Sequence, residues 1–261
     1  MIAPKLKISI VTISFNQSKY LKQCIESVLN QSYTSFEYII VDAGSSDGSR
    51  ELIQSYSDPR LRYVFEPDSG PADGLNKGLR SIQGDIFCYI NSDDFFEADA
   101  FHELVSIFNS WSSVDIVLSS AFLRNGRGSI LRVLHPSKYW HLSLYAIGLA
   151  NAVQQSTFFR VTSAFKGLMF NVDNKSNWDA EFLVDAVMAG MRVKSFPFIM
   201  SSFRVYEGSI SGSNKNFLPY INHRNRIRKK ILAQYKFPIR HILVVISFIL
   251  NIRDFKSRSL I

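Results

Sequence analysis

The sequence predicts an α/β fold with a mostly parallel central sheet flanked by helices. Runs of apolar, uncharged residues, typical of buried parallel strands, alternate four times with segments that suit amphipathic helices or loops. Each of these four runs ends abruptly in polar residues, and open α/β sheets bind their ligands at that edge. We therefore expect right-handed crossovers and a ligand cleft along one edge of the sheet.

The first half of the chain supplies the four parallel strands. We expect strands over residues 7–14, 36–41, 61–65 and 86–90. The intervening helices should begin near Ser18, which can cap a helix, span about 49–56, and run from Pro71 to Leu79. The loop over 43–49 is rich in Gly and Ser, but it is neither a dinucleotide fingerprint nor a Walker A loop.

The second half is patterned less regularly. We expect a strand over 114–118, a hairpin turn at 125–128, and a strand-like run over 154–160 before a helix near Ser163. A helix opening at Asn177 should end at Gly190. A strand and then a loop should cover 203–211, and this loop is expected either to be flexible and cover the bound ligand or to be a plain surface connection. We divide the chain into a catalytic domain (1–214, halves 1–110 and 111–214) and a helical tail (215–261).

Positive charge is concentrated in the tail. The net charge of the chain is +8, yet residues from 215 onward carry eleven Lys or Arg and one acid, so the first 214 residues sum to −2. The apolar run over 242–250 is shorter than the ~20 residues that span a bilayer. We expect an interfacial helix on an anionic membrane, with a core or homodimer helix as the alternative. Nucleic acid is disfavoured because aromatic residues do not interleave with the charges.

The remaining bulk features indicate a cytoplasmic globular protein. A hydrophobic fraction of 46% supports a sizeable core. Cys24 and Cys88 lie in apolar patterns and without metal spacing, so we expect free thiols in a reducing compartment. A strand begins almost at the N-terminus, so we expect no signal peptide.

Polar side chains follow all four predicted strands. They are Asn16, then Asp42, then Glu66 with Asp68, then Asn91 with Asp93. One such end is ordinary capping, but four along one edge describe a cleft for a nucleotide-type ligand. Asp93 and Asp94 are adjacent carboxylates that would repel each other unless a cation such as Mg²⁺ or Mn²⁺ offset them, and such ions also hold substrate phosphates. A helix N-cap is the alternative interpretation of this acidic cluster.

The motifs taken together resemble family 2 glycosyltransferases, which have the GT-A fold. The matching stretches, in the family's order, are 11–16, 41–49, 66–70, 73–78, 84–85 and 91–94. The resemblance is dense over 7–110 and looser to about 212. It implies a nucleotide-sugar donor, usually UDP-linked, and transfer with inversion.

The resemblance also implies roles for individual residues. Phe15 and Asp42 would lie beside the base and the ribose, and Asp73 and Lys77 would lie near the diphosphate, unless they form an exposed helix face. The full predicted donor-binding set is Ser14, Phe15, Asn16, Asp42, Asp68, Asp73, Lys77, Asn91 and Ser92.

The family's metal motif is only partly present. Asp93 matches its last acid and is the predicted ligand for Mn²⁺ or Mg²⁺, with Asp94 as the alternative ligand. Asn91 replaces the first acid of the motif, and Ala43 replaces an acid after the second strand.

The family's general base corresponds to Asp179, at the start of the helix that ends at Gly190, with Glu181 as the second candidate. Trp178 replaces the usual preceding acid. The chemistry needs one carboxylate near the acceptor hydroxyl. An acid favoured there only by the helix dipole is the alternative.

We therefore predict a metal-dependent, inverting hexosyl- or N-acetylhexosaminyl-transferase. Its acceptor would be a lipid-linked oligosaccharide in surface polysaccharide biosynthesis, at the inner face of the plasma membrane. Two alternatives stay open: a sugar nucleotidyltransferase, and a nucleotide-sugar-binding module without activity.

Overall fold

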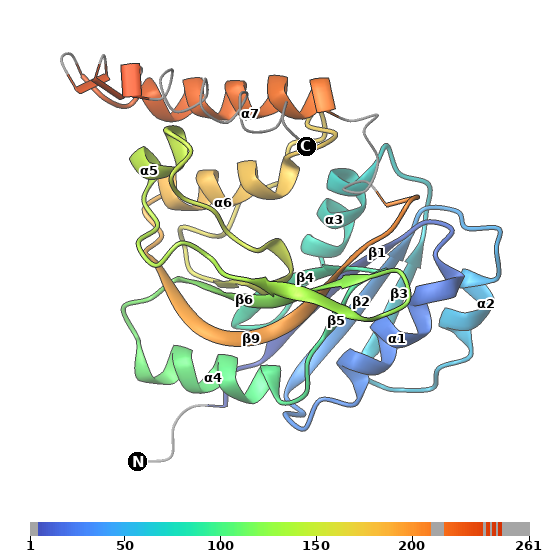
Figure 1. Ribbon diagram of the computed structural model, residues 1–261. Coiled ribbons are helices and arrows are strands. Elements are labelled where there is room, and N and C mark those ends of the chain that lie inside the picture. The colour runs from blue at the N-terminus through green and yellow to red at the C-terminus, as the bar shows by residue number, and fades with distance from the viewer. Residues whose placement is uncertain (1–4, 210–216, 237–238, 241, 244, 247–261) are drawn as a thin grey trace.

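The structure is a computed structural model that describes residues 5–209, 217–236, 239–240, 242–243 and 245–246. A nine-stranded sheet runs through it in the order β3-β2-β1-β4-β8-β6-β9-β5, with β7 paired to β6 (Figure 1). The strands are β1 (Ile8–Ser14), β2 (Phe36–Asp42), β3 (Leu61–Phe65), β4 (Ile86–Asn91), β5 (Phe95–Phe96), β6 (Ile116–Asn125), β7 (Ile130–Leu134), β8 (Thr157–Arg160) and β9 (Val193–Val205).

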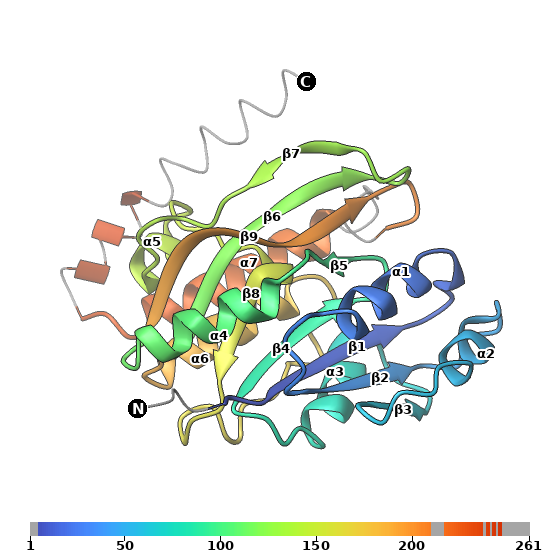
Figure 2. The same cartoon turned by 90° about the horizontal axis from the view of Figure 1, so that it is seen from below.

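Helices cover both faces of this sheet. They are α1 (Ser18–Leu29), α2 (Ser49–Gln54), α3 (Pro71–Leu79), α4 (Ala100–Ser110), α5 (Leu142–Ala146), α6 (Trp178–Met188) and α7 (Phe217–Leu232), with a 3₁₀ turn at Gln154–Ser156. The predicted α/β fold is confirmed. Strands β1 to β4 pair in parallel as expected, whereas β8 is antiparallel to both β4 and β6. Figure 2 shows β6, β7 and β9 side by side beyond the parallel strands.

The core has two layers, one on each side of the sheet. Because successive strand side chains point to opposite faces, Ile10 packs in the layer under α1 and α4 while Val11 packs in the layer under α3 and α6. Helix α3 lies especially close to β1. A Cβ at Gly78 would stand 2.5 Å from the Val11 Cγ1, so only glycine allows this approach. The close packing places the loop before α3 at the carboxyl edge of the sheet.

Three local predictions differ from the structure. No helix forms near Ser163, because residues 163–167 make successive turns and Gly167 has a φ of 94°. Ser18 is not the cap of α1: Gln17 holds that position, and the Ser18 backbone N–H donates to Asp47 instead. The strand predicted over 114–118 continues to Asn125, where the hairpin turn then occurs as predicted.

The C-terminal helix α7 lies within the predicted helical tail (215–261) and packs on α5 and α6. The predicted boundary at 214 lies in 210–216, outside the described residues, as does most of the apolar run over 242–250, so the domain division stays a prediction. In the part of the chain that is described, no helix has the length and apolar character needed to cross a bilayer. Both cysteines are buried and free, as expected.

Candidate active site

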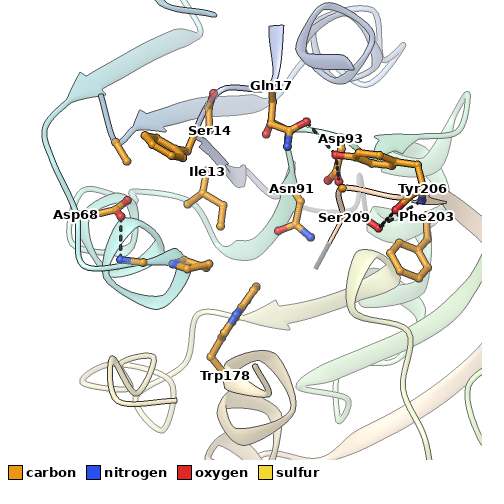
Figure 3. Close-up of a pocket in the computed structure, with 16 residues that line it drawn as sticks. Ile13, Ser14, Gln17, Asp68, Asn91, Asp93, Trp178, Phe203, Tyr206 and Ser209 are labelled. Carbon is orange, nitrogen blue, oxygen red and sulfur yellow. Dashed lines mark hydrogen bonds between the residues drawn. The ribbon is translucent and has the colours of Figure 1, made fainter. Parts of the chain in front are cut away.

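A cavity of about 570 Å³ opens at the carboxyl ends of β1 and β4 (Figure 3). The parallel strands, the loop before α3, the start of α6 and the end of β9 all contribute to its wall. The lining residues are Ile13, Ser14, Phe15, Gln17, Ala43, Asp68, Gly70, Pro71, Asn91, Ser92, Asp93, Trp178, Phe203, Tyr206, Gly208 and Ser209. The predicted cleft at the strand ends therefore exists as one cavity.

We call the side of the cavity lined by Gln17, Asn91, Ser92, Asp93 and Tyr206 the polar wall, and Asp93 is its carboxylate. It is half-buried after β4, and the Tyr206 hydroxyl lies 3.2 Å from its Oδ2 atom. The same hydroxyl lies 3.1 Å from the Gln17 Oε1 atom, and because it carries one proton it can donate to only one of these oxygens at a time. Burial raises the pKa of Asp93, although the Tyr206 hydrogen bond and the charge of Arg204 oppose this. Tyr206 thus links the loops after β1, β4 and β9.

Arg204 supplies positive charge behind this wall. Its side chain is buried, its guanidinium donates to the Asp93 carbonyl and to the Gln23 Oε1 atom, and it stacks on the Tyr20 ring at 4.4 Å. A cation at this depth partly offsets the two adjacent carboxylates. The sequence pattern did not single out Arg204 or Tyr206, because both lie more than 100 residues from Asp93 along the chain.

Asp94 faces away from the cavity. Its carboxylate is buried and accepts hydrogen bonds from the Arg204 backbone N–H (2.8 Å) and the Gln155 side chain (2.9 Å). Burial, and then the charge of Asp93, raise its pKa well above the usual range. These bonds attach the end of β9 to the turn after β4, which is a structural role.

Five of the predicted donor-binding residues line the cavity: Ser14, Phe15, Asp68, Asn91 and Ser92. Ser14 and Ser92 contribute at the ends of β1 and β4, and the Phe15 ring stands 58% exposed at the rim. Asn16 instead adopts a φ of 52° and accepts a hydrogen bond from the Ser46 N–H at 2.9 Å, so it joins the loops after β1 and β2.

Asp42 is fully buried, and its carboxylate forms hydrogen bonds within the loop that follows it. Its Oδ1 atom accepts from the backbone N–H groups of Gly44 and Ser45 and from the Arg50 Nε atom at 3.1 Å. Burial would raise the pKa of Asp42, but the hydrogen bonds from Ser45, Arg50 and Gly44 lower it overall. The cavity wall after β2 is formed by Ala43 instead.

The loop before α3 brings Asp68 to the cavity, where burial raises its pKa. Asp73 and Lys77 do not line the cavity. The Asp73 carboxylate accepts from the Ser69 N–H at 3.0 Å, and the Lys77 ammonium donates to the Pro67 carbonyl and lies 3.6 Å from Glu66. Both side chains hold the loop that carries Asp68.

Helix α6 begins on the opposite wall. Trp178, its first residue, lines the cavity across from Asn91 (Figure 3), and Asp179 follows it at the half-buried N-terminal end. Burial raises the pKa of Asp179. The pKa values of Tyr89 and Tyr145 are raised first by burial and then by the negative charge of Asp179. A carboxyl with a raised pKa beside a cavity is a candidate proton acceptor.

Glu181 has a different environment. It is 4% exposed and accepts from Asn174 (2.7 Å), Asn171 (3.1 Å) and Arg226 (2.8 Å). Burial would raise its pKa, but these three partners lower it overall. All of its contacts join α6 to the preceding loop and to α7, so Glu181 is suited to a structural role.

We expect Glu181→Gln to lower the free energy of unfolding by about 1–3 kcal/mol, because it removes the ion pair with Arg226 and leaves one asparagine amide without its acceptor. The folded-state pKa is depressed, so this stabilisation is present above the ordinary Glu pKa and is lost as the pH falls through the folded value. Urea unfolding at several pH values measures it. Glu26→Gln, which removes an exposed ion pair with Lys22, is the control and should change stability by less than about 1 kcal/mol. Equal effects of the two substitutions would contradict the assignment.

Comparison with known proteins assigns the chain to a family. Residues 9–175 match the family described as "Glycosyl transferase family 2", and the chain belongs to that family. It is 26% identical over 222 residues to an uncharacterised glycosyltransferase of Rickettsia conorii (80% of this chain, 36% of that protein). It is 39% identical over 95 residues to "Putative teichuronic acid biosynthesis glycosyltransferase TuaG" of Bacillus subtilis (35% of this chain, 38% of that protein). The chain spans about a third of the length of these curated relatives.

Solved structures share the fold at low sequence identity. The S. aureus TarS fragment in complex with UDP-GlcNAc has a TM-score of 0.70 at 18% identity, covering 90% of this chain and 69% of that chain. A mannosyltransferase of Pyrobaculum calidifontis in complex with GDP-Man and Mn²⁺ has a TM-score of 0.59 at 14% identity, covering 97% and 83%. The GT-A fold expected from the motifs is thereby confirmed.

Proposed function

We propose that this glycosyltransferase moves a sugar from a UDP-sugar to a hydroxyl of a saccharide acceptor, with inversion. The observation that carries the proposal is the single cavity whose wall includes both Asp93 and Trp178, the residue that precedes Asp179. The structures of TarS with UDP and with UDP-GlcNAc support a UDP-linked donor and favour N-acetylhexosaminyl over hexosyl transfer.

The strand ends provide distinct donor contacts. The exposed Phe15 ring at the rim is a flat apolar surface on which a nucleobase can stack. Ser14 and Ser92, which line the cavity at the ends of β1 and β4, are the proposed contacts to the ribose and the diphosphate. Asp42 acts on the donor indirectly, by fixing the loop that contains Ala43.

The polar wall fits a divalent ion that binds together with the donor. Among the described residues, no three His, Cys, Asp or Glu side chains gather as a metal site. Mg²⁺ and Mn²⁺ need few protein ligands when phosphates supply the rest, and Asp93 with the Asn91 side-chain oxygen meets that need. The Asn91 amide nitrogen, not its oxygen, makes the contacts to Asp94 and Gln154. When bound, the ion supplies Lewis-acid stabilisation of the departing diphosphate.

Asp179 is the proposed general base. It removes the proton from the acceptor hydroxyl, whose oxygen then forms a bond to the anomeric carbon while the bond from that carbon to the diphosphate breaks. Trp178 provides an apolar surface for a sugar ring on the same side of the cavity. Asp93 thus lines the donor side of the cavity, while Asp179 directly follows Trp178, which lines the opposite wall.

The rate should depend on pH through Asp179. A base must be deprotonated, and burial raises the pKa of this carboxyl. We therefore expect kcat to fall toward acid with a midpoint above the ordinary Asp value of about 3.9. A profile of kcat against pH measures this midpoint, and a flat profile down to the ordinary value would contradict the assignment.

Donor screening tests the function directly. UDP-GlcNAc, UDP-glucose and GDP-mannose are incubated with the enzyme, and release of the nucleoside diphosphate is followed with and without Mn²⁺. We expect turnover with a UDP-sugar and an added saccharide acceptor. Tight UDP binding without any turnover would instead support a non-catalytic binding module.

The similarity to TuaG, which is described as acting in teichuronic acid biosynthesis, supports a surface polysaccharide as the product. We propose a lipid-linked oligosaccharide as the acceptor, in line with the resemblance.

A further inference from the structure

Helix α7 forms an outer layer of the molecule, beyond α5 and α6 (Figure 1). Its own residues Ile227 and Ile231 are fully buried. Two ion pairs attach it to α6, from Arg226 to Glu181 at 2.8 Å and from Lys230 to Asp185 at 2.5 Å. The inner side of α7 is therefore buried against the rest of the protein.

Beyond α7, the described residues 239–240, 242–243 and 245–246 are helical, and three of them expose aliphatic side chains. Ile239, Ile242 and Val245 are 54%, 55% and 56% exposed. Their spacing of three places them on one side of a helix, while Leu243 packs against the protein core. Three exposed branched residues in one row form an apolar helix face turned to the outside.

The charge around this row has one sign. Residues 217–246 contain seven Lys or Arg and no acid. Arg226 and Lys230 are used in the ion pairs to α6, whereas Lys229, Lys236 and Arg240 are exposed along the outside. We call Lys229, Lys236, Ile239, Arg240, Ile242 and Val245 the basic-apolar face.

We propose that the basic-apolar face docks on an anionic membrane surface. Aliphatic side chains between cations suit the boundary between acyl chains and acidic headgroups. A second copy of the chain would bring two cationic surfaces together, which is unfavourable. Nucleic acid would be expected to meet aromatic rings for stacking, and this face presents aliphatic side chains instead.

If the proposed function holds, the position of the basic-apolar face sets the side from which an acceptor reaches the cavity. Because Arg226 and Lys230 join α7 to α6, a membrane under the basic-apolar face lies on the same side of the sheet as α6, whose first turn carries Asp179. An acceptor held in the membrane would then approach the enzyme from the α6 side, opposite Asp93.

Vesicle flotation of the full chain tests the proposal. We expect binding to phosphatidylcholine vesicles that contain phosphatidylglycerol, at least about tenfold weaker binding to phosphatidylcholine alone, and weakening as salt rises. The triple variant Ile239→Ser, Ile242→Ser, Val245→Ser and the double variant Lys236→Ala, Arg240→Ala should each lose about tenfold or more. The control Ile130→Ser, Leu131→Ser removes two equally exposed residues of β7 and should bind as wild type does.

Several outcomes would overturn the proposal: equal binding to both vesicle types, no binding to either, or full binding by the triple variant. A dimer in light scattering that the triple variant abolishes would assign the face to a second copy, and RNA binding that the same variant abolishes would assign it to nucleic acid. UDP affinity separates this proposal from the function. Vesicle failure with intact UDP binding overturns only the membrane surface, and loss of UDP binding with vesicle binding intact overturns only the donor.

Discussion

Asp179→Asn is expected to lower kcat by a factor of about 10²–10⁴ while leaving the affinity for UDP unchanged. The substitution keeps the size of the side chain but removes its ability to accept a proton from the acceptor hydroxyl. We expect donor binding to be unaffected because the proposed donor contacts come from Phe15 and Asp93, whereas Asp179 follows Trp178 on the opposite wall of the cavity. Single-turnover kinetics and calorimetry measure the two quantities separately.

Asp173→Asn is the matched control for this substitution. Asp173 is an exposed acid in the loop that leads to α6, so its loss changes the charge of the region without touching the cavity. It should retain wild-type turnover. If Asp179→Asn also retained most of its turnover, Asp179 would not be the base, and the raised pKa would reflect burial alone.

Asp93→Ala is expected to lower kcat/KM by a factor on the order of 10² or more and to remove the effect of Mn²⁺ on UDP affinity. Asp93 is the carboxylate of the acidic pair that faces the cavity, so without it the ion loses its charged protein ligand. Calorimetric titration of UDP, with and without Mn²⁺, measures the effect.

Asp94→Asn separates a metal ligand from a structural acid. Its buried carboxylate accepts from the Arg204 backbone and from Gln155, so we expect a lower melting temperature but a retained Mn²⁺ effect on UDP affinity. Loss of the Mn²⁺ effect in this variant, with retention in Asp93→Ala, would reverse the two roles.

The parallel half of the fold could be read from the sequence because its signals are local. Each strand is a short apolar run with a polar end, and Pro71 and Gly190 mark helix termini directly. The helix predicted near Ser163 does not form, because the structure there depends on contacts between distant residues. No strong local signal covers 163–167, and Phe165 within these turns packs against Phe87 of β4 and Phe182 of α6, which are distant in the sequence.

The candidate site divides in the same way. Asp93, Phe15 and Ser14 lie in the cavity wall, because the edge of a parallel sheet collects the ends of its strands, and their roles stay predictions. Asp42 and Lys77 have the expected positions in the chain, yet their side chains face their own loops. The direction in which these two side chains point depends on their hydrogen-bond partners, and the sequence pattern does not reveal those partners.

The part of the cavity wall contributed by the end of β9 depends on contacts across the chain. Tyr206 reaches Asp93 over 113 residues, and Phe203 enters the cavity from the end of β9. Strand β9 is positioned by pairing in parallel with β6 and antiparallel with β5. Sequence spacing does not reveal these pairings, so Tyr206 and Phe203 become candidates only in the folded structure.

Binding of UDP to the wild-type chain, titrated by calorimetry with and without Mn²⁺, tests the central claim most directly. The cavity at the ends of β1 and β4 predicts saturable binding of one UDP per chain, with tighter binding when Mn²⁺ is present. Failure to bind UDP, GDP or dTDP in either condition would contradict the assignment of this cavity as a nucleotide-sugar site.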